Sequence, residues 1–254
     1  DRAGVARVIL SPLARDPEDV MALARAFPKR VVPALTTKSG PGDRDFQGTF
    51  DGQLKRFAWV AMAETLLWHA AKGKRAPEIV QWPDDEKIQF LLNHAKARGW
   101  PFTAHIEFGA IGAERARFLA AFEAMLAANP DHPFVVPHMG QLEADEMAAL
   151  IARHANLHFT TSHANPLTAR KYPDYPWVNM FADEDLAPRW KALIVAHPDR
   201  FVLAFDNVWP KHWGRFFVKQ VKLWKRALAG LPEEVAHAVA HRNAERLWKL
   251  APLE

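Results

Sequence analysis

The sequence predicts an α/β fold in which parallel strands alternate with helices in a barrel of the (β/α)8 type. Short apolar runs alternate along the chain with amphipathic helical patterns. The runs are almost continuously apolar, which is typical of a parallel sheet covered by helices on both faces. Three runs end on a polar residue, namely His105, His138 and Asp206. In such a barrel the carboxyl ends of all strands meet on the face that carries the chemistry.

Seven strands are predicted from apolar runs rich in β-branched and aliphatic residues. They cover residues 5–11, 30–36, 78–82, 101–107, 133–138, 157–161 and 201–206. Helical patterns fill most of the intervals, at residues 17–27, 53–72, 83–98, 113–129, 143–154 and 186–197, and two or three helices follow residue 212. Residues 162–185 form an irregular segment that contains three prolines.

Local signals support several of these boundaries. Asp16 and Pro17 are the residues expected at the N-cap and first position of a helix. Gly99 is expected to end the helix that opens at Pro83. The polar stretch Thr37–Gly48 is long enough to predict a functional loop over the strand ends.

Seven strands are one fewer than a closed barrel of this kind needs. An open seven-stranded sheet has two exposed edges, which favour aggregation. We therefore expect the natural protein to carry a further strand before Asp1. Residues 1–252 are predicted to form a single domain, and Leu253–Glu254 resemble a remnant of a cloning vector.

The composition is that of an ordinary globular protein. Of the 254 residues 49% are hydrophobic and 24% charged, and the formal net charge is +4. The only tight basic cluster, Lys72–Arg75, follows a predicted helix, so no nucleic-acid partner is expected. No apolar run approaches the roughly 20 residues of a membrane span. The absence of cysteine excludes disulfides and thiolate metal sites, and it fits a soluble protein of the cytoplasm or the periplasm. A small-molecule substrate is expected, and homo-oligomerisation is left open.

Strand alternation predicts which side chains accompany the three polar residues. Thr103 and Glu107 should share the inward face of His105, although Glu107 is expected to lie too far along the strand to contact it. Phe134 and Val136 should share the face of His138. Val202 and Ala204 should share the face of Asp206, so that the large residues Phe201, Leu203 and Phe205 face the helices.

Two imidazoles and one carboxylate at one face indicate ligands and proton carriers for a divalent metal. Each residue also has a simpler interpretation. A single histidine at a strand end is often a hydrogen-bonded packing residue, and Asp206 could cap the next helix.

Other candidates are weaker. Ser162 and His163 follow a strand and should lie on the active face. Trp82, Trp209 and Trp213 could line a substrate pocket, although tryptophan is more often a core residue. Within the predicted helix at residues 53–72, Glu64 is expected to point to solvent and His69 to lie at the helix end.

Four segments together resemble a known family. They are Pro101-Phe-Thr-Ala-His105, Pro133-Phe-Val-Val-Pro-His138-Met-Gly140, Phe201-Val-Leu-Ala-Phe-Asp206 and Asn243-Ala-Glu-Arg-Leu-Trp248. They look like the strand-5, strand-6 and strand-8 motifs and the C-terminal helix of the amidohydrolase-related metal-dependent hydrolases. Residues 3–12 resemble the second strand of that family, so the resemblance covers nearly the whole chain.

The resemblance implies a TIM barrel with one divalent metal, usually zinc, although manganese is compatible with it. His105 would be the strand-5 ligand. His138 would be a second ligand, or an acid/base residue that polarises the substrate. Asp206 would be the strand-8 ligand and general base. The family's His-x-His pair belongs to the first strand and has no counterpart in this sequence, and Ala204-Phe205 replace the glycine-serine pair that precedes the strand-8 aspartate.

Three functions follow as hypotheses. The first is a metal-dependent hydrolase of a C–N or C–O bond in a small amide, ester or lactone, with catalytic Asp206 and His138. The second is a metal-dependent decarboxylase of an aromatic or unsaturated acid, in which His138 or Asp206 protonates carbon. The third is a non-catalytic barrel that binds a ligand.

Overall fold

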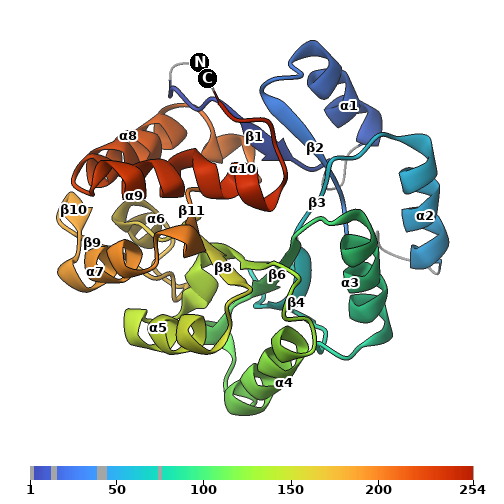
Figure 1. Cartoon of the computed structure of the whole chain (residues 1–254), viewed down its shortest axis with the longest axis horizontal. Coiled ribbons are helices and arrows are strands. Elements are labelled where there is room, and N and C mark those ends of the chain that lie inside the picture. Colours follow the sequence, from blue (N-terminus) through green and yellow to red (C-terminus); the bar gives the residue numbers. More distant parts are fainter. Residues whose placement is uncertain (1–2, 13–15, 39–44, 74–75, 254) are drawn as a thin grey trace.

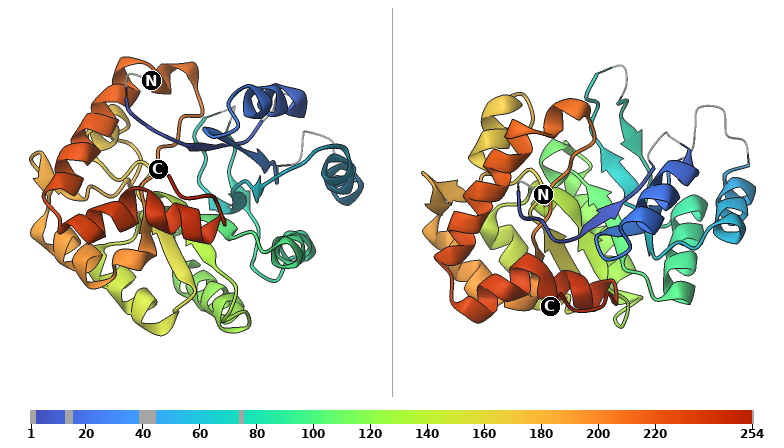
Figure 2. Two further views of the ribbon diagram at one scale, coloured as in Figure 1. Left: turned by 45° about the horizontal axis from the view of Figure 1, so that its top comes forward. Right: turned by 90° about the horizontal axis from the view of Figure 1, so that it is seen from above.

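The computed structural model describes residues 3–12, 16–38, 45–73 and 76–253, and it has the predicted α/β barrel architecture (Figures 1 and 2). Hydrogen bonds order the barrel strands as β1-β2-β3 and β11-β8-β7-β6-β4, and all of these pairs are parallel. Only two residues separate β3 from β4, so one stretch of chain belongs to both sheets. Within the described residues β1 and β11 do not pair, and the strands form an open arc.

The strands are short. In chain order they are β1 (Val8–Leu10), β2 (Val31–Leu35), β3 (Ala61–Met62), β4 (Thr65–His69), β5 (Ile79–Val80), β6 (Phe102–Ile106), β7 (Phe134–Val136), β8 (Leu157–Thr160), β9 (Phe181–Ala182), β10 (Asp185–Leu186) and β11 (Phe201–Val202).

Helices occupy the connections and surround the strands (Figure 1). They are α1 (Pro17–Ala26), α2 (Phe46–Arg56), α3 (Glu86–Arg98), α4 (Arg115–Ala127), α5 (Ala144–Arg153), α6 (Pro166–Lys171), α7 (Pro188–Ala196), α8 (Arg215–Ala229), α9 (Glu233–His237) and α10 (Asn243–Leu247). A π-helical turn at Ala238–Arg242 joins α9 to α10. No helix in the described ranges is both long and apolar enough to cross a membrane.

Two helix boundaries are confirmed in atomic detail. The Asp16 carboxylate accepts a hydrogen bond from the backbone N–H of Glu18 at the start of α1. Gly99 ends α3 with φ of 63°, a left-handed conformation that glycine adopts without steric cost. The loop predicted at residues 37–48 is shorter, because α2 begins at Phe46, and residues 39–44 lie outside the described residues.

The predicted helix at residues 53–72 is wrong beyond Arg56. The chain leaves α2 at Arg56 and then forms β3 and β4, which are buried along most of their length. A short apolar run that is buried on both faces has no periodicity to separate strand from helix. The predicted strand at 78–82 is reduced to β5, an antiparallel addition to the edge of β4. Residues 61–69 therefore provide the third barrel strand.

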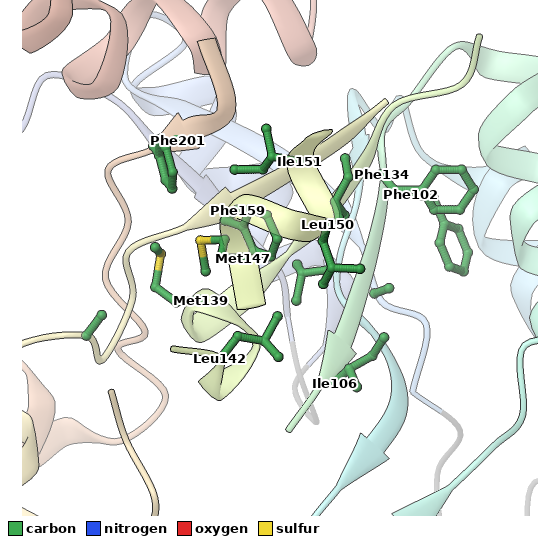
Figure 3. Packing of buried hydrophobic residues seen from close by; sticks show 14 of the residues in the cluster. Phe102, Ile106, Phe134, Met139, Leu142, Met147, Leu150, Ile151, Phe159 and Phe201 are labelled. Atoms are coloured by element: carbon green, nitrogen blue, oxygen red, sulfur yellow. The ribbon is translucent and has the colours of Figure 1, made fainter. Parts of the chain in front are cut away.

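The larger hydrophobic core lies between the strands and the surrounding helices. Phe102, Phe134, Phe159 and Phe201 contribute to it from four strands, together with α5 residues such as Leu150 (Figure 3). Phe201 faces the helices as predicted. Ala104 and Ile106 also belong to this outer core, which leaves Thr103, His105 and Glu107 on the inward face, again as predicted.

The prediction for β7 is off by one residue. Phe134 and Val136 belong to the outer core, and Val135 instead faces the barrel interior. The cause is that β7 ends at Val136 and the backbone turns to a positive φ at His138. Strand alternation therefore cannot be extended from β7 to this histidine.

A second apolar cluster fills the barrel interior. Small inward residues of the strands meet Leu247 and Trp248 at the end of α10; these strand residues are Val32, Ala34, Ala61, Val135 and Val202. The C-terminal helices are the red segment beside β11 in Figure 1. Packing against α10 closes the barrel interior at a distance from the polar strand ends.

Candidate functional site

Five potential ligand side chains gather at the carboxyl ends of the strands. Each follows or ends a different strand: Glu64 lies between β3 and β4, His105 in β6, His138 after β7, His163 after β8 and Asp206 after β11. The parallel sheet brings these residues together although up to 142 positions of sequence separate them. This is the face on which barrels of this kind carry their chemistry.

His105 lies between two carboxylates. Its Nδ1 is 3.2 Å from Oε2 of Glu64, and its Nε2 is 3.3 Å from Oε1 of Glu107. Each carboxylate also has a lysine partner, since Lys38 Nζ lies 3.0 Å from Glu64 Oε1 and Lys72 forms an ion pair with Glu107. The result is a chain of alternating charges across the strand ends. Glu107 therefore does contact His105, contrary to the expectation from its position along the strand.

His138, His163 and Asp206 form the other half of the site. The two imidazole rings stack, with centroids 4.8 Å apart and an interplanar angle of 10°. Asp206 Oδ2 lies 3.1 Å from Nε2 of His163 and 4.0 Å from Nε2 of His138. His138 also joins the two halves, because its ring centroid lies 5.0 Å from that of His105.

Ser162 sets the orientation of His138. The backbone N–H of His138 donates to Oγ of Ser162 at 3.2 Å. The ring Nδ1 lies 2.9 Å from the same hydroxyl and 3.3 Å from the Ser162 carbonyl oxygen. Because Nδ1 of His138 is hydrogen-bonded to Ser162, Nε2 of the same ring faces Asp206. A buried partner on the far nitrogen is the usual way in which proteins fix the tautomer of a metal-binding histidine.

The backbone at both stacked histidines is left-handed. His138, Met139, Gly140 and Gln141 have φ between 54° and 61°, and His163 has φ of 63°. Only Gly140 adopts this region without a Cβ penalty. Non-glycine residues in this conformation cost roughly 1–3 kcal/mol each and concentrate at functional sites. The left-handed backbone directs both imidazoles away from their strands and toward Asp206.

The buried charges strongly shift the protonation of these groups. Burial opposes the charged form of His105, but Glu64 and Glu107 raise its pKa to about 9. Burial and the neighbouring His163 and His105 lower the pKa of His138 to about 3. Burial of Asp206 is outweighed by the hydrogen bond and charge of His163, and its pKa falls to about 2. At neutral pH His138 is therefore neutral and Asp206 is ionised.

Two sets of donor atoms drawn from these five side chains could hold a metal ion. One consists of Glu64, His105 and His138, and the other of His138, His163 and Asp206; within each set the donor atoms lie within 4.8 Å of one another. Imidazole nitrogens and carboxylate oxygens are the donors that zinc and related divalent ions take. The donor chemistry therefore fits the metal that the sequence predicts.

The predicted trio is found in one site but not in one ligand set. His105 and Asp206 fall in different sets, and His138 is common to both. Asp206 does not cap the following helical turn, which has Trp209 as its N-cap. His163, a weaker candidate, contacts Asp206 directly.

The expectations for Glu64 and His69 are wrong. Glu64 points into the site and contacts His105, and His69 forms a third set of donors with His105 and Glu107. Both errors follow from assigning residues 53–72 to a helix. The available signal was the position of Glu64 between two apolar segments, Ala61–Met62 and Thr65–Leu67, which would have marked a polar residue at a strand end.

The structure places a tryptophan against the site that the sequence does not single out. Trp82 packs on Phe118, with Arg117 above its ring, and Trp209 and Trp213 are 40% and 45% exposed. Instead Trp177, in the irregular segment after α6, lies edge-on to His138 and His163, with centroid distances of 5.3 and 4.6 Å. Nothing in the local sequence distinguished Trp177 from core tryptophans.

Comparison with known proteins identifies the family. An amidohydrolase family model matches residues 77–250, more than half of the chain, and the protein therefore belongs to that family. No curated protein sequence matches the chain.

Solved structures share the fold at low sequence identity. An uncharacterised TIM-barrel protein of Bordetella bronchiseptica is 16% identical, with a TM-score of 0.66 over 98% of this chain and 79% of its own. A zinc-containing amidohydrolase of Burkholderia multivorans is 14% identical (TM-score 0.54, covering 97% and 84%). The 2,6-dihydroxybenzoate decarboxylase of Rhizobium is 13% identical (TM-score 0.51, covering 92% and 76%). These likenesses show the TIM-barrel fold, and the family model shows that the chain belongs to the amidohydrolases.

Proposed function

We propose that this protein is a metal-dependent hydrolase that cleaves a C–N or C–O bond of a small amide, ester or lactone. The observation that carries the proposal is geometric: Oδ2 of Asp206 lies 4.0 Å from Nε2 of His138, within a ring of five side chains whose donor atoms could hold a metal ion. Glu64, His105, His138, His163 and Asp206 would hold one divalent ion, with His138 as the common ligand. Zinc is the preferred candidate, and manganese is the alternative.

A bound divalent ion would polarise a substrate carbonyl and make water a stronger acid. The residues of the chain supply the proton transfer. Asp206, with its pKa of about 2, is a proton acceptor at neutral pH and can pass the proton on to the leaving group. His163, 3.1 Å from Oδ2, fixes the direction in which the carboxylate points. His138 is hydrogen-bonded to Ser162 through Nδ1, and its Nε2 faces Asp206.

Lys38 is a further group available to the reaction. Its ammonium lies against Glu64, 3.0 Å away. Burial opposes its charge, but Glu64 and the more distant Asp206 raise its pKa, so it stays protonated at neutral pH. A fixed cation beside Glu64 can stabilise negative charge that develops on a substrate oxygen.

A decarboxylase is the second candidate, and the position of Trp177 favours it. This ring lies against both stacked imidazoles and carries the ammonium of Lys72 5.3 Å from its centroid. An aromatic acid could lie against such a wall. The protonation states argue in the other direction, because at neutral pH His138 is a neutral imidazole and Asp206 a carboxylate, and neither is then an effective acid toward carbon.

The test is metal analysis combined with turnover. Zinc- or manganese-loaded protein is assayed against a panel of small esters, lactones and amides, and aromatic acids are assayed for carbon dioxide release. We expect hydrolysis, with kcat lowered about 10²- to 10⁴-fold in Asp206→Asn. Asp131→Asn, an exposed carboxylate before β7, is the matched control and should keep full activity. A protein that binds no metal and turns over none of these compounds would be the non-catalytic barrel.

A further inference from the structure

A pair of histidines lies one helical turn apart on the C-terminal helices, outside the site described above. His237 ends α9, and His241 lies in the π-helical turn that leads into α10. Their side chains are 46% and 28% exposed. Nδ1 of His237 lies 3.4 Å from Nε2 of His241, and the ring centroids are 5.5 Å apart.

The spacing of these two nitrogens is that of a chelate. Two zinc–nitrogen bonds of 2.0–2.1 Å that meet at a tetrahedral angle place the nitrogens about 3.3 Å apart. The pair in this structure needs almost no movement to reach that distance. A π-helical turn is itself a feature that recurs at functional sites in helices, and here it contains His241.

Glu245 orients His241 so that it can bind a metal ion. Its Oε1 lies 3.1 Å from Nδ1 of His241 and also accepts the backbone N–H of Leu253. The ionised carboxylate favours a proton on Nδ1 of His241, so the lone pair is on Nε2, the atom that faces His237. This is the carboxylate–histidine arrangement that supports metal ligands.

A second carboxylate, Glu233, lies next to His237. Glu233 Oε1 lies 3.9 Å from Nε2 of His237. The sequence Glu233-x3-His237-x3-His241-x3-Glu245 thus places acidic side chains on both sides of the imidazole pair. Ligand residues four apart on a helix share one face, and their charges favour a cation between them.

We propose that His237 and His241 form a second, surface site for a divalent transition-metal ion such as zinc, with Glu245 as the positioning residue of His241. The ion would bind Nδ1 of His237 and Nε2 of His241, and solvent would complete its coordination. Because it involves no strand-end residue, the site is independent of the proposed hydrolase activity.

The proposal is tested by zinc titration in an isothermal calorimeter, with the wild type compared to His237→Gln, His241→Gln and the double variant. The wild type should bind one zinc ion more per chain than the double variant, and each single variant should weaken that binding at least about 10-fold. Glu245→Gln should weaken it about 10- to 100-fold while both ligands remain. His197→Gln is the control, since this helix-end histidine has no second histidine four residues away.

A spectroscopic readout keeps the test independent of stability. Copper(II) added to protein already loaded with zinc at the strand-end site should show electron paramagnetic resonance hyperfine structure from two imidazole nitrogens, reduced to one in either single variant. Equal zinc stoichiometry and affinity in the wild type and the folded double variant would overturn the proposal, as would an unchanged copper spectrum.

Discussion

The two ends of the barrel interior use the same strands for opposite purposes. At the carboxyl ends, buried charges and left-handed histidines surround an acidic and imidazole-rich site. Toward α10, small apolar residues such as Ala34 and Ala61 pack against Leu247 and Trp248. The polar end is costly to fold, because each buried charge must be paired. The apolar end contributes the burial that offsets such a cost. The comparison predicts that substitutions at the two ends affect different properties.

The largest effect on stability is expected at the apolar end. Trp248→Ala removes a large side chain, 8% exposed, that packs against the barrel interior. Truncation of a buried tryptophan costs about 3–5 kcal/mol. Urea denaturation should show this loss of stability. The zinc affinity of the strand-end site in the remaining folded protein should match that of the wild type. A variant of normal stability, or one that loses zinc binding while folded, would break the proposed division between the two ends.

Two buried histidines, one at each end, should titrate with opposite consequences. His105 has a pKa raised to about 9, against an ordinary value of 6.5. Its stabilisation of metal-free protein is complete below about pH 6.5 and is lost as the pH rises through 9. At 1.36 kcal/mol per unit the loss is up to about 3 kcal/mol. His158 in β8 is the contrast, since burial and the nearby Arg246 and Arg200 lower its pKa to about 4. The contribution of neutral His158 to the free energy of unfolding is lost as the pH falls from 6.5 to 4.

Urea denaturation of metal-free protein across pH 4–10 measures both slopes. His105→Gln should flatten the alkaline slope. His158→Gln should reduce the acid slope only in part and leave the alkaline one unchanged, because His138, with a pKa lowered to about 3, also loses stability in acid. The two slopes test the surroundings of His105 and His158 separately, because stability falls toward alkaline pH for one and toward acid pH for the other. If His105→Gln leaves the alkaline slope unchanged, its carboxylate partners do not hold the charge that we assign to it.

The smallest effect is expected at an exposed left-handed residue beside the apolar end. Lys249 follows α10 with φ of 52°, at a position where glycine commonly ends a helix. Lys249→Gly should stabilise the protein by about 0.5–1 kcal/mol, because the Cβ strain disappears. Differential scanning calorimetry should record a higher Tm. A lower Tm would mean that the lysine side chain contributes more than its backbone strain costs.

The sequence predicts the parts of this molecule that local chemistry determines. The Asp16 cap, the Gly99 stop and the outward Phe201 of β11 are confirmed because each depends on neighbours within a few residues. β4 was predicted as helix, because a strand buried on both faces has no alternation to reveal it. The error hid Glu64 and His69, two members of the site.

Other features depend on contacts between distant segments. The stacking of His138 on His163 requires left-handed turns after two separate strands, and Trp177 reaches the site from an irregular segment. The pKa values of His105 and His138 diverge although both are buried imidazoles. Two carboxylates contact His105, whereas at His138 burial and two neighbouring histidines outweigh Asp206 and Glu64. Such differences follow from tertiary geometry and have no signature in a single sequence.

The central claim is that the ring of Glu64, His105, His138, His163 and Asp206 holds a divalent ion. The most direct measurement is anomalous diffraction at the zinc edge from crystals of zinc-loaded protein. We expect an anomalous peak inside this ring, about 2.0–2.2 Å from a nitrogen of His138 and from donors of at least two other members. The same peak should be absent from crystals of His138→Gln. Zinc-loaded crystals with no peak in the ring, or with a peak that persists without His138, would contradict it.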